Sequence, residues 1–221
     1  MRYEFRFDVL WRNLPYLVNG VWVTLQVAAV AISLGVVIGL VTALFRLSRY
    51  RVLSIPATLY LIVFRNTPVL VQLMWVYYGL PIVLGLQTEP LTSSALSLAV
   101  SAGAFLSEIF RAGILSIERG QIEAGRSLGM SAALTMRQIV LPQAVRQMLP
   151  PFGNMFVDYV KYSSLVSVLG VADLTYRAQV LAVNTFRPME IFTGLAVVYF
   201  LLCTALTYAV SVMERRTSIP T

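Results

Sequence analysis

The sequence of 221 residues contains no histidine, a single cysteine and little charge. Without histidine, zinc sites, haem sites and histidine-based acid–base catalysis are not expected. The one cysteine, Cys203, cannot form an internal disulfide, which argues against a disulfide-stabilised scaffold. Charged residues make up 12% of the chain, compared with about 25% in soluble domains. This is too little charge to cover a soluble surface, so a water-soluble globule is excluded.

Apolar residues are abundant instead, at 58% of the chain, which excludes intrinsic disorder and predicts an all-α membrane protein. A helix needs about 20 apolar residues to cross a bilayer. The uncharged stretches predict one domain over residues 1–221 with five transmembrane helices, at about 17–45, 54–84, 92–115, 145–171 and 190–213. The second stretch contains prolines and is too short for two crossings, so we expect one crossing with a break near Asn66–Pro68. Gly35 and Gly39 form a Gly-xxx-Gly step that predicts close helix packing.

The net charge of +7 is unevenly distributed between the two sides of these spans. Ten arginines fall on one side (46, 49, 51, 111, 119, 126, 137, 146, 215 and 216) and five on the other (2, 6, 12, 177 and 187). Because basic residues collect in cytoplasmic loops, this predicts an N-terminus outside and a C-terminus in the cytoplasm. Topology therefore accounts for the basic balance, and no nucleic-acid partner is expected. The first apolar stretch is also too long for a cleavable signal peptide.

One extended polar region, residues 117–141, interrupts the apolar pattern. Ile117, Ile122, Ala124 and Leu128 recur at helical spacing among charged residues, which predicts a short amphipathic helix. Its expected end is Gly129, because glycine accepts the left-handed conformation found after helices. Ser131 can then cap a second helix over 132–140, and Pro142 is expected to mark the next boundary. Such a loop fits either a docking element for a partner or a segment lying along the membrane interface.

The spacing of motifs in this loop resembles a known family. Glu123-Ala124-Gly125, Gly129 and the later Ile139-Val140-Leu141-Pro142 are similar to the EAA loop of permease subunits of bacterial ABC importers. Further motifs resemble the polar amino acid uptake subfamily: Phe64-Arg65-Asn66-Thr67-Pro68, Ser107-Glu108-Ile109-Phe110-Arg111-Ala112-Gly113, Ser127-Leu128-Gly129-Met130, Leu141-Pro142-Gln143-Ala144 and Lys161-Tyr162-Ser163-Ser164-Leu165. The resemblance covers about residues 17–213. In two departures, Gly125 replaces the usual second alanine and Tyr162 replaces a common aspartate.

The resemblance implies a transport subunit rather than an enzyme, in the bacterial cytoplasmic membrane. It implies that an ATPase docks on the loop, with five ATPase-coupling residues: Gly120, Glu123, Ala124, Gly125 and Gly129. Expected partners are ATP-binding ABC subunits, a second permease chain that is identical or homologous, an extracytoplasmic substrate-binding protein and membrane lipid. The chain has no Gly-rich Lys-Ser/Thr phosphate loop, so no cofactor is expected in it, and ATP and Mg²⁺ belong to the partner ATPase.

Charged and polar residues within the spans are candidates for the substrate path, since ionisable groups there usually line a cavity or pair with one another. The candidates are Arg65, Asn66, Thr67, Gln72, Asp158, Lys161, Ser163 and Ser164. Asp158 with Lys161, and Glu108 with Arg111, are three residues apart and so are expected to pair on one helix face. Structural ion pairs, a proline kink and helix-packing hydroxyls are the alternative interpretations of these residues.

The resemblance implies alternating-access import of a polar amino acid such as glutamate, histidine, arginine, glutamine or cystine. A permease for another small polar solute is an alternative. A secondary transporter is a further one, although its usual internal repeats are not visible. A membrane-embedded enzyme would need a nucleophile–base pair or a metal cluster, and the sequence shows neither.

Overall fold

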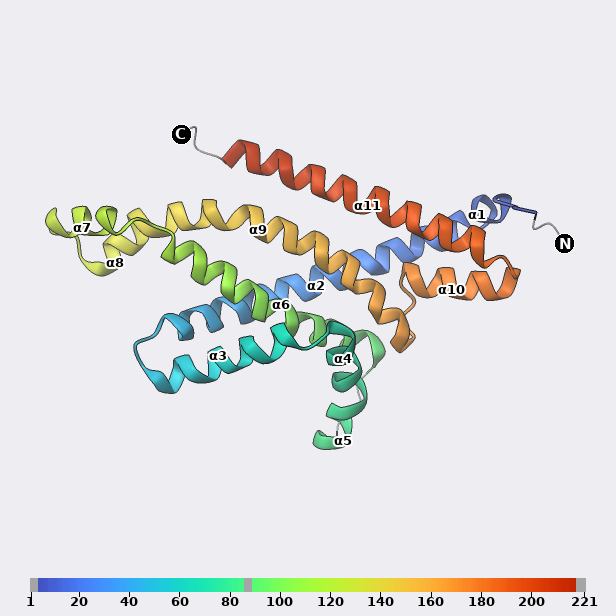
Figure 1. Ribbon diagram of the computed structural model, residues 1–221, viewed down its shortest axis with the longest axis horizontal. Helices are drawn as coiled ribbons and strands as arrows, with labels where there is room; N and C mark the ends of the chain where they lie inside the picture. The colour runs from blue at the N-terminus through green and yellow to red at the C-terminus, as the bar shows by residue number, and fades with distance from the viewer. Residues whose placement is uncertain (1–3, 86–88, 218–221) are drawn as a thin grey trace.

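The computed structural model describes residues 4–85 and 89–217, and every regular element in these ranges is helical. Two segments are π-helical (η1 and η2) and one is a 3₁₀ helix (η3). In chain order (Figure 1) the elements are α1 (Asp8–Arg12), α2 (Leu14–Leu47), α3 (Arg51–Asn66), α4 (Val69–Met74), η1 (Trp75–Gly79), α5 (Leu80–Leu84), α6 (Pro90–Leu115), α7 (Arg119–Ser127), α8 (Ala132–Thr135), η2 (Met136–Val140), α9 (Leu141–Tyr162), η3 (Ser163–Leu169), α10 (Leu174–Thr185) and α11 (Pro188–Thr217).

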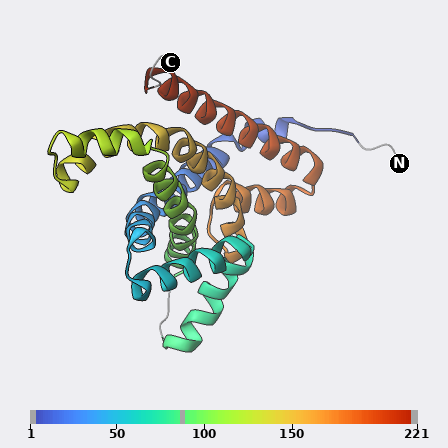
Figure 2. The ribbon, with the colours of Figure 1, turned by 60° about the vertical axis from the view of Figure 1, so that its left-hand side comes forward.

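Three of these helices are long and apolar enough to cross a membrane, namely α2, α6 and residues 188–215 of α11. Two further candidates are bent pairs: α3 with residues 69–84, bent by 110°, and residues 132–169 with α10, bent by 49°. The described chain therefore has three candidate spans, or up to five if each bent pair is one span. Figure 2 shows α4 and α5, in green, turned away from α3, and the yellow-green α7–α8 segment projecting from the bundle.

The boundary expected at Pro142 coincides with the start of α9, which begins at Leu141 with Pro142 in its first turn. Helical turns nevertheless run without a break from Ala132 through η2 into α9. Proline supplies no N–H and its ring displaces the carbonyl one turn back. The π-helical segments η1 and η2 lie directly before Pro81 and Pro142, where a wider turn accommodates the ring. The helix α10, at Leu174–Thr185, was not predicted from the sequence.

The most extensive helix pair in the structure is α2 with α6, as the Gly-xxx-Gly step predicts. A Cβ atom built on Gly35 would lie 2.7 Å from the Cβ of Ala102, and one on Gly39 would lie 2.8 Å from the Cβ of Leu106. These approaches are too short for any side chain at the two glycines. The two backbones therefore lie close together, and α9 packs against both to complete the main core.

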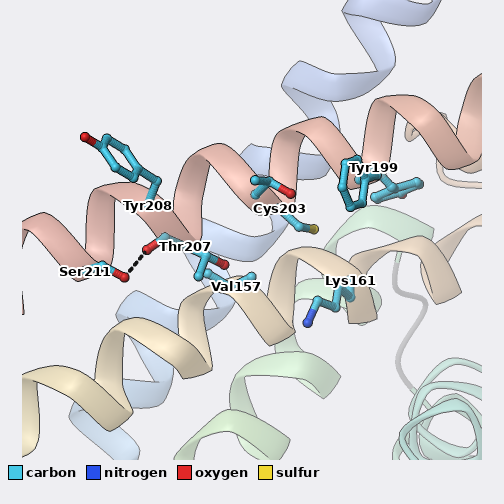
Figure 3. A pocket seen from close by; sticks show the side chains of 9 residues that line it. Val157, Lys161, Tyr199, Cys203, Thr207, Tyr208 and Ser211 are labelled. Atoms are coloured by element: carbon cyan, nitrogen blue, oxygen red, sulfur yellow. Dashed lines mark hydrogen bonds between the residues drawn. The ribbon is translucent and has the colours of Figure 1, made fainter.

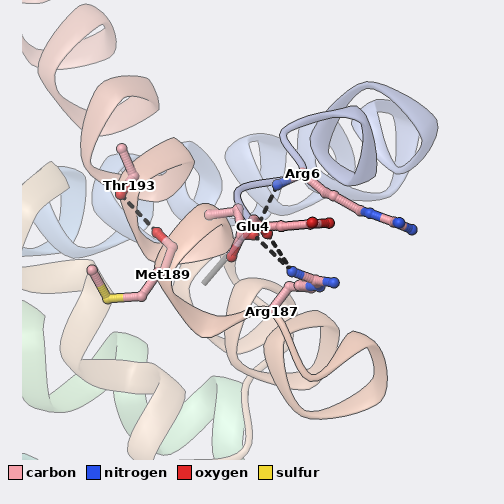
Figure 4. A network of polar contacts seen from close by, with 6 residues as sticks. Glu4, Arg6, Arg187, Met189 and Thr193 are labelled. Carbon is pink, nitrogen blue, oxygen red and sulfur yellow. Dashed lines mark hydrogen bonds and ion pairs between the residues drawn. The ribbon is translucent and has the colours of Figure 1, made fainter. Parts of the chain in front are cut away.

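The N-terminal segment is tied to the start of α11 by a polar cluster (Figure 4). The backbone N–H of Arg6 donates to Oε1 of the fully buried Glu190 at 3.0 Å. Nη1 of Arg187 donates to the carbonyl oxygen of Glu4 at 2.7 Å and lies 3.5 Å from the Glu190 carboxylate. These contacts hold the chain start against the α10–α11 turn, at the end of the molecule opposite α7 and α8 (Figure 1). Arg2, counted on this side in the sequence, lies outside the described residues.

Candidate functional site

The loop of residues 117–141, hereafter called the coupling loop after its predicted role, forms the projecting end of the molecule (Figure 1). Helix α7 ends at Ser127, and Gly129 follows with a φ of +76°, in the left-handed region. The N–H of Met130 donates to the carbonyl oxygen of Gly125 at 3.1 Å, which closes the turn. Ser131 then caps α8 by accepting a hydrogen bond from the N–H of Leu134 at 3.3 Å. The glycine turn and the serine cap expected from the sequence are confirmed.

The five predicted coupling residues divide into two groups. Gly120, Glu123, Ala124 and Gly129 are exposed, whereas Gly125 is buried. A Cβ at Gly125 would lie 2.9 Å from Cδ1 of Ile139. Gly125 therefore lies close to η2, and a methyl group there would require a small shift of the Ile139 side chain. Gly125 contributes to packing inside the loop, and the other four are available to a partner.

Leu128 was expected on the apolar face of the amphipathic helix, and that expectation is wrong. Its side chain is 82% exposed, because the chain leaves the helix at this position and turns at Gly129. The face that is buried comprises Ile117 and, partly, Ile122, which pack with Val140 and Ala144. Leu128 is therefore a largely exposed apolar side chain at the tip of a polar loop.

The coupling loop is fastened to both helices that it joins. The amide Nε2 of Gln143, in α9, donates to Oε1 of Gln121, in α7, at 2.6 Å. The hydroxyl of Ser116, at the end of α6, donates to Oε1 of Gln147 in α9. The buried cluster around Val140 adds apolar contact between the same segments. Helix α7 is thus in direct contact with α9, and the end of α6 with α9.

A groove of about 370 Å³ lies between α6 and α9, next to the coupling loop. It is lined by polar side chains, Glu108, Ser116 and Gln147, and by apolar ones that include Phe105 and Met155. Ser116 and Gln147 were not among the sequence candidates for the substrate path. Glu108 carries a charge inside a predicted span, and the sequence favoured an ion pair with Arg111, with contact to the substrate as the alternative.

The ion pair expected between Glu108 and Arg111 is wrong, because Glu108 pairs with Arg65 in α3 instead. Both partners are partly exposed, at 44% for each side chain, so the pair sits at an accessible surface. Spacing along one helix predicted the i,i+3 partner, but packing of α3 against α6 brings a nearer guanidinium. Glu108 lines the α6–α9 groove, so Arg65 is connected to the groove only through this ion pair.

The chain break predicted near Asn66–Pro68 is present, and Gln72 stabilises it. Helix α3 ends at Asn66 and α4 begins at Val69, across the bend of 110°. The Gln72 amide donates to the carbonyl oxygens of Phe64 at 2.9 Å and Thr67 at 2.7 Å. These are carbonyls that the interrupted helix leaves without their usual partners. Gln72 is 5% exposed, so its position suits support of the break rather than contact with a solute.

Asp158 and Lys161 form the ion pair that their spacing predicts, at 3.1 Å, but in a different groove. Lys161 lines a groove of about 600 Å³ between α9 and α11 (Figure 3). Hydroxyl groups of α11 face the same groove, including Thr204, Thr207 and Ser211. The two candidate cations, Arg65 and Lys161, are therefore not brought together into a single site.

The remaining candidates follow α9 or precede α4. Ser163 is fully buried and donates to the carbonyl oxygen of Val160 at 2.7 Å, while Ser164 donates to that of Lys161 at 2.7 Å. Both hydroxyls are thus engaged with their own helix. Thr67 donates to the carbonyl oxygen of Val63 at 2.8 Å, and Asn66 is exposed at the helix end. Within residues 4–85 and 89–217, no cluster of three or more side chains could hold a metal ion.

Comparisons with known proteins agree with the helical architecture. A family model described as "Binding-protein-dependent transport system inner membrane component" matches residues 35–219. A glutamine transport system permease protein of Escherichia coli (strain K12) is 35% identical over 98% of this chain and 99% of its own length. A probable amino-acid ABC transporter permease protein of Bacillus subtilis (strain 168) is 34% identical over 97% of this chain and 94% of its own.

Solved structures extend the likeness to the fold. A chain from the crystal structure of an amino acid ABC transporter with histidines is 36% identical, with a TM-score of 0.92 over 97% of this chain and 100% of that one. A chain of the methionine ABC transporter MetNI in an inward-facing conformation has a TM-score of 0.80 at 23% identity, covering 94% of this chain and 99% of that one. The second likeness concerns the fold alone.

Proposed function

This chain belongs to the family of binding-protein-dependent transport system inner membrane components, and on that premise we propose that it imports a polar amino acid as the membrane-spanning subunit of an ATP-driven transporter. It is a permease-type membrane protein of the amino-acid ABC transporter class. We propose further that the chain crosses the membrane five times, with its N-terminus outside. Its proposed partners are an ATPase that binds ATP and Mg²⁺ and hydrolyses the ATP, a second permease chain and an extracytoplasmic binding protein.

The coupling loop supports the docking part of this proposal most directly. Exposed Glu123 and Ala124 lie on one short helix, followed by the exposed Leu128 and the Gly129 turn. An isolated apolar side chain on a rigid polar tip suits insertion into a pocket of a partner, where its burial becomes favourable. We assign the ATPase contact to this surface, with Gly125 holding α7 against η2 from behind.

The same loop joins the two helices that form the α6–α9 groove. Because α7 is hydrogen-bonded to α9 through Gln143, and α6 to α9 through Ser116 and Gln147, movement of the docked helix changes the spacing of the groove walls. Alternating access then consists of widening and narrowing this groove as the ATPase pair opens and closes. The substrate path is thereby linked to the energy source over a short, packed route.

The Arg65–Glu108 pair gives the groove the two charges that a zwitterionic solute needs. An α-carboxylate would exchange for Glu108 on the guanidinium of Arg65, and an α-ammonium would exchange for Arg65 on Glu108. Gln147 and Ser116 supply an amide and a hydroxyl for a polar side chain. With the glutamine permease relatives, this neutral polar lining favours L-glutamine as the first solute to test.

The test is uptake into proteoliposomes that contain this chain with its ATPase and binding protein. Arg65→Ala is expected to raise the KM for L-glutamine roughly ten- to a hundredfold, the effect of losing a hydrogen bond to a charged group. Lys161→Gln, in the other groove, is the matched control and should leave the KM unchanged. Equal uptake by wild type and Arg65→Ala at normal membrane levels would refute the substrate role of Arg65.

The same preparation separates the remaining alternatives. Uptake that continues without the ATPase and follows a proton or sodium gradient would indicate a secondary transporter. ATP-dependent uptake that is competed by another polar solute, but not by L-glutamine, would keep the importer and replace the proposed substrate. Substrate specificity is first measured on the binding protein, since it selects what is delivered.

A further inference from the structure

A buried carboxylate lies at the start of α10, the helix that packs against both α2 and α11. Asp173 caps α10, because its Oδ1 atom accepts a hydrogen bond from the N–H of Tyr176 at 2.8 Å. The Asp173 residue is 0% exposed. Its second oxygen, Oδ2, is enclosed and has no hydrogen-bond partner within residues 4–85 and 89–217. The helix therefore satisfies one oxygen of this carboxylate and leaves the other unsatisfied.

The two residues after Asp173 tie α10 to its neighbouring helices. The N–H of Leu174 donates to the hydroxyl of the buried Thr24, in α2, at 3.2 Å. The hydroxyl of Thr175 forms a hydrogen bond of 3.0 Å with the hydroxyl of Tyr199, in α11. These five residues are hereafter called the α10 junction. Tyr199 also lines the α9–α11 groove (Figure 3), so the junction borders that groove.

No basic side chain neutralises the Asp173 carboxylate in the part of the chain that the structure describes. The nearest arginine along α10, Arg177, is directed elsewhere. Its Nε donates to the carbonyl oxygen of Ala172 at 3.0 Å, and its Nη1 donates to that of Tyr16 at 3.3 Å. The guanidinium also lies over the Tyr16 ring, 4.8 Å from its centre. Asp173 is therefore a buried acid without a counter-ion.

The groups around Asp173 favour its neutral form. From α11 the titratable side chain that faces it is the Tyr199 phenol, which is uncharged at neutral pH. The α2 residue in the junction is the neutral Thr24, and η3 contains no titratable residue. Burial raises the pKa of the Asp173 carboxyl to about 6, although the N–H groups of Tyr176 and Thr175 act in the opposite direction. Asp173 follows the fourth predicted span, which ends at about residue 171.

We propose that Asp173 is a proton-sensitive switch that holds α10 against α2 and α11. With the carboxyl protonated, no charge is buried and the α10 junction is stable as described. When the proton leaves, the buried charge favours a rearrangement in which water reaches the carboxylate and α10 separates from Thr24 and Tyr199. The closed junction binds the proton more tightly than an open one. Its stability is therefore greatest below about pH 4, the ordinary range of an aspartate, and is lost as the pH rises through about 6.

The position of the switch gives its opening a consequence for transport. Figure 1 shows α10 at the end of the molecule that carries α1, opposite α7 and α8. In the orientation proposed above this end is outside, so the switch responds to the external pH. Opening frees Tyr199, which forms part of the wall of the α9–α11 groove. The external location rests on the proposed function, whereas the switch itself depends neither on the orientation nor on the solute.

The test is hydrogen–deuterium exchange of α10 peptides in the purified importer, assembled with its ATPase, at about pH 5 and about pH 7.5. Rates are corrected for the intrinsic pH dependence of amide exchange. Wild-type α10 should open about tenfold more at the higher pH, as linkage requires for a carboxyl whose pKa rises from about 4 to about 6. Asp173→Asn keeps a capping oxygen but cannot titrate, so its exchange should be slow at both pH values. Asp8→Asn, which removes an exposed carboxylate at the same end, is the matched control and should keep the tenfold difference.

Equal corrected exchange of wild type at the two pH values would overturn the proposal, whether or not any variant folds. A pH dependence that persists in Asp173→Asn, or one that disappears in Asp8→Asn, would overturn it as well. Fast exchange of Asp173→Asn at both pH values would leave Asp173 a structural cap without a switch. If Asp173→Asn does not fold, as judged by circular dichroism and gel filtration, Asp173→Ser takes its place, since serine also caps helices. None of these results bears on the proposed import of an amino acid, because uptake is not measured.

Discussion

Replacement of Gly129 tests the coupling loop through its backbone alone. Gly129 has a φ of +76°, and a Cβ atom built on it would meet nothing within 4 Å. A side chain there creates no collision inside the chain, so its cost arises from the left-handed conformation, about 1–2 kcal/mol for an L-residue. That energy is enough to reduce the population of the turn by roughly 5- to 30-fold if no partner holds it.

The turn sets the direction of α8 relative to α7 and places Leu128 at the tip. Losing it should impair docking while the protein still inserts, because the membrane-spanning helices are not altered. The expected order of coupled transport is wild type, then Gly129→Asn, then Gly129→Ala, then Gly129→Val. Asparagine tolerates the left-handed region better than other residues with a side chain, whereas a β-branched residue there is strained most.

The assay is the ratio of ATP hydrolysed to solute transported in proteoliposomes, at matched amounts of inserted protein. Gly85→Val is the control, since Gly85 also has a positive φ, of +66°, and faces open space, but it follows α5 outside the loop. Its replacement carries the same backbone strain, so coupling should be preserved. Normal substrate-stimulated ATPase activity and uptake in Gly129→Val would refute the reasoning. An equal loss in Gly85→Val would indicate general destabilisation instead of a change in the loop turn.

Further predictions concern packing, the helix break and topology. Gly39→Leu should lower the stability of the protein in detergent by roughly 1–3 kcal/mol, because the larger side chain overpacks against α6. Val37→Leu, at a position that is 61% exposed, is the control and should have little effect. Equal melting temperatures for the two variants would contradict the close α2–α6 contact. Gln72→Leu should lower the stability by about 1–3 kcal/mol, because two carbonyl groups lose their hydrogen-bond donor. The KM for the substrate should stay unchanged. A change in KM without a loss of stability would instead support contact between Gln72 and the substrate. In a background without the native cysteine, Leu128→Cys should react with impermeant thiol reagents only from the cytoplasmic side and Phe186→Cys only from the outside. Labelling of both from one side would overturn the proposed orientation.

The sequence anticipated the local features of the candidate site well. Gly129 and Ser131 were identified correctly because a left-handed turn and a helix cap depend on neighbouring residues only. The break before Pro68 follows for the same reason, since proline disrupts a helix wherever it stands. Pro142 lies in the first turn of α9, as expected, but the π-helical turn before it lets the chain continue as a helix.

Partners distant in the sequence could not be predicted in the same way. Glu108 has Arg111 one turn away on its own helix, yet Arg65 from α3 pairs with it. This pairing depends on how the helices pack across the bundle, and spacing along one helix carries no information about that.

The sequence by itself determined the class of protein, since scarce charge and long apolar stretches are incompatible with a soluble surface. It also determined the coupling loop, where motif spacing and local conformation coincide. Only the tertiary structure decided which charges meet, which polar residues line the α6–α9 groove, and that Leu128 is exposed while Gly125 is buried. The physical reason is that composition and periodicity act through neighbours in the chain, whereas a site in a helical bundle is assembled from helices that approach one another in space.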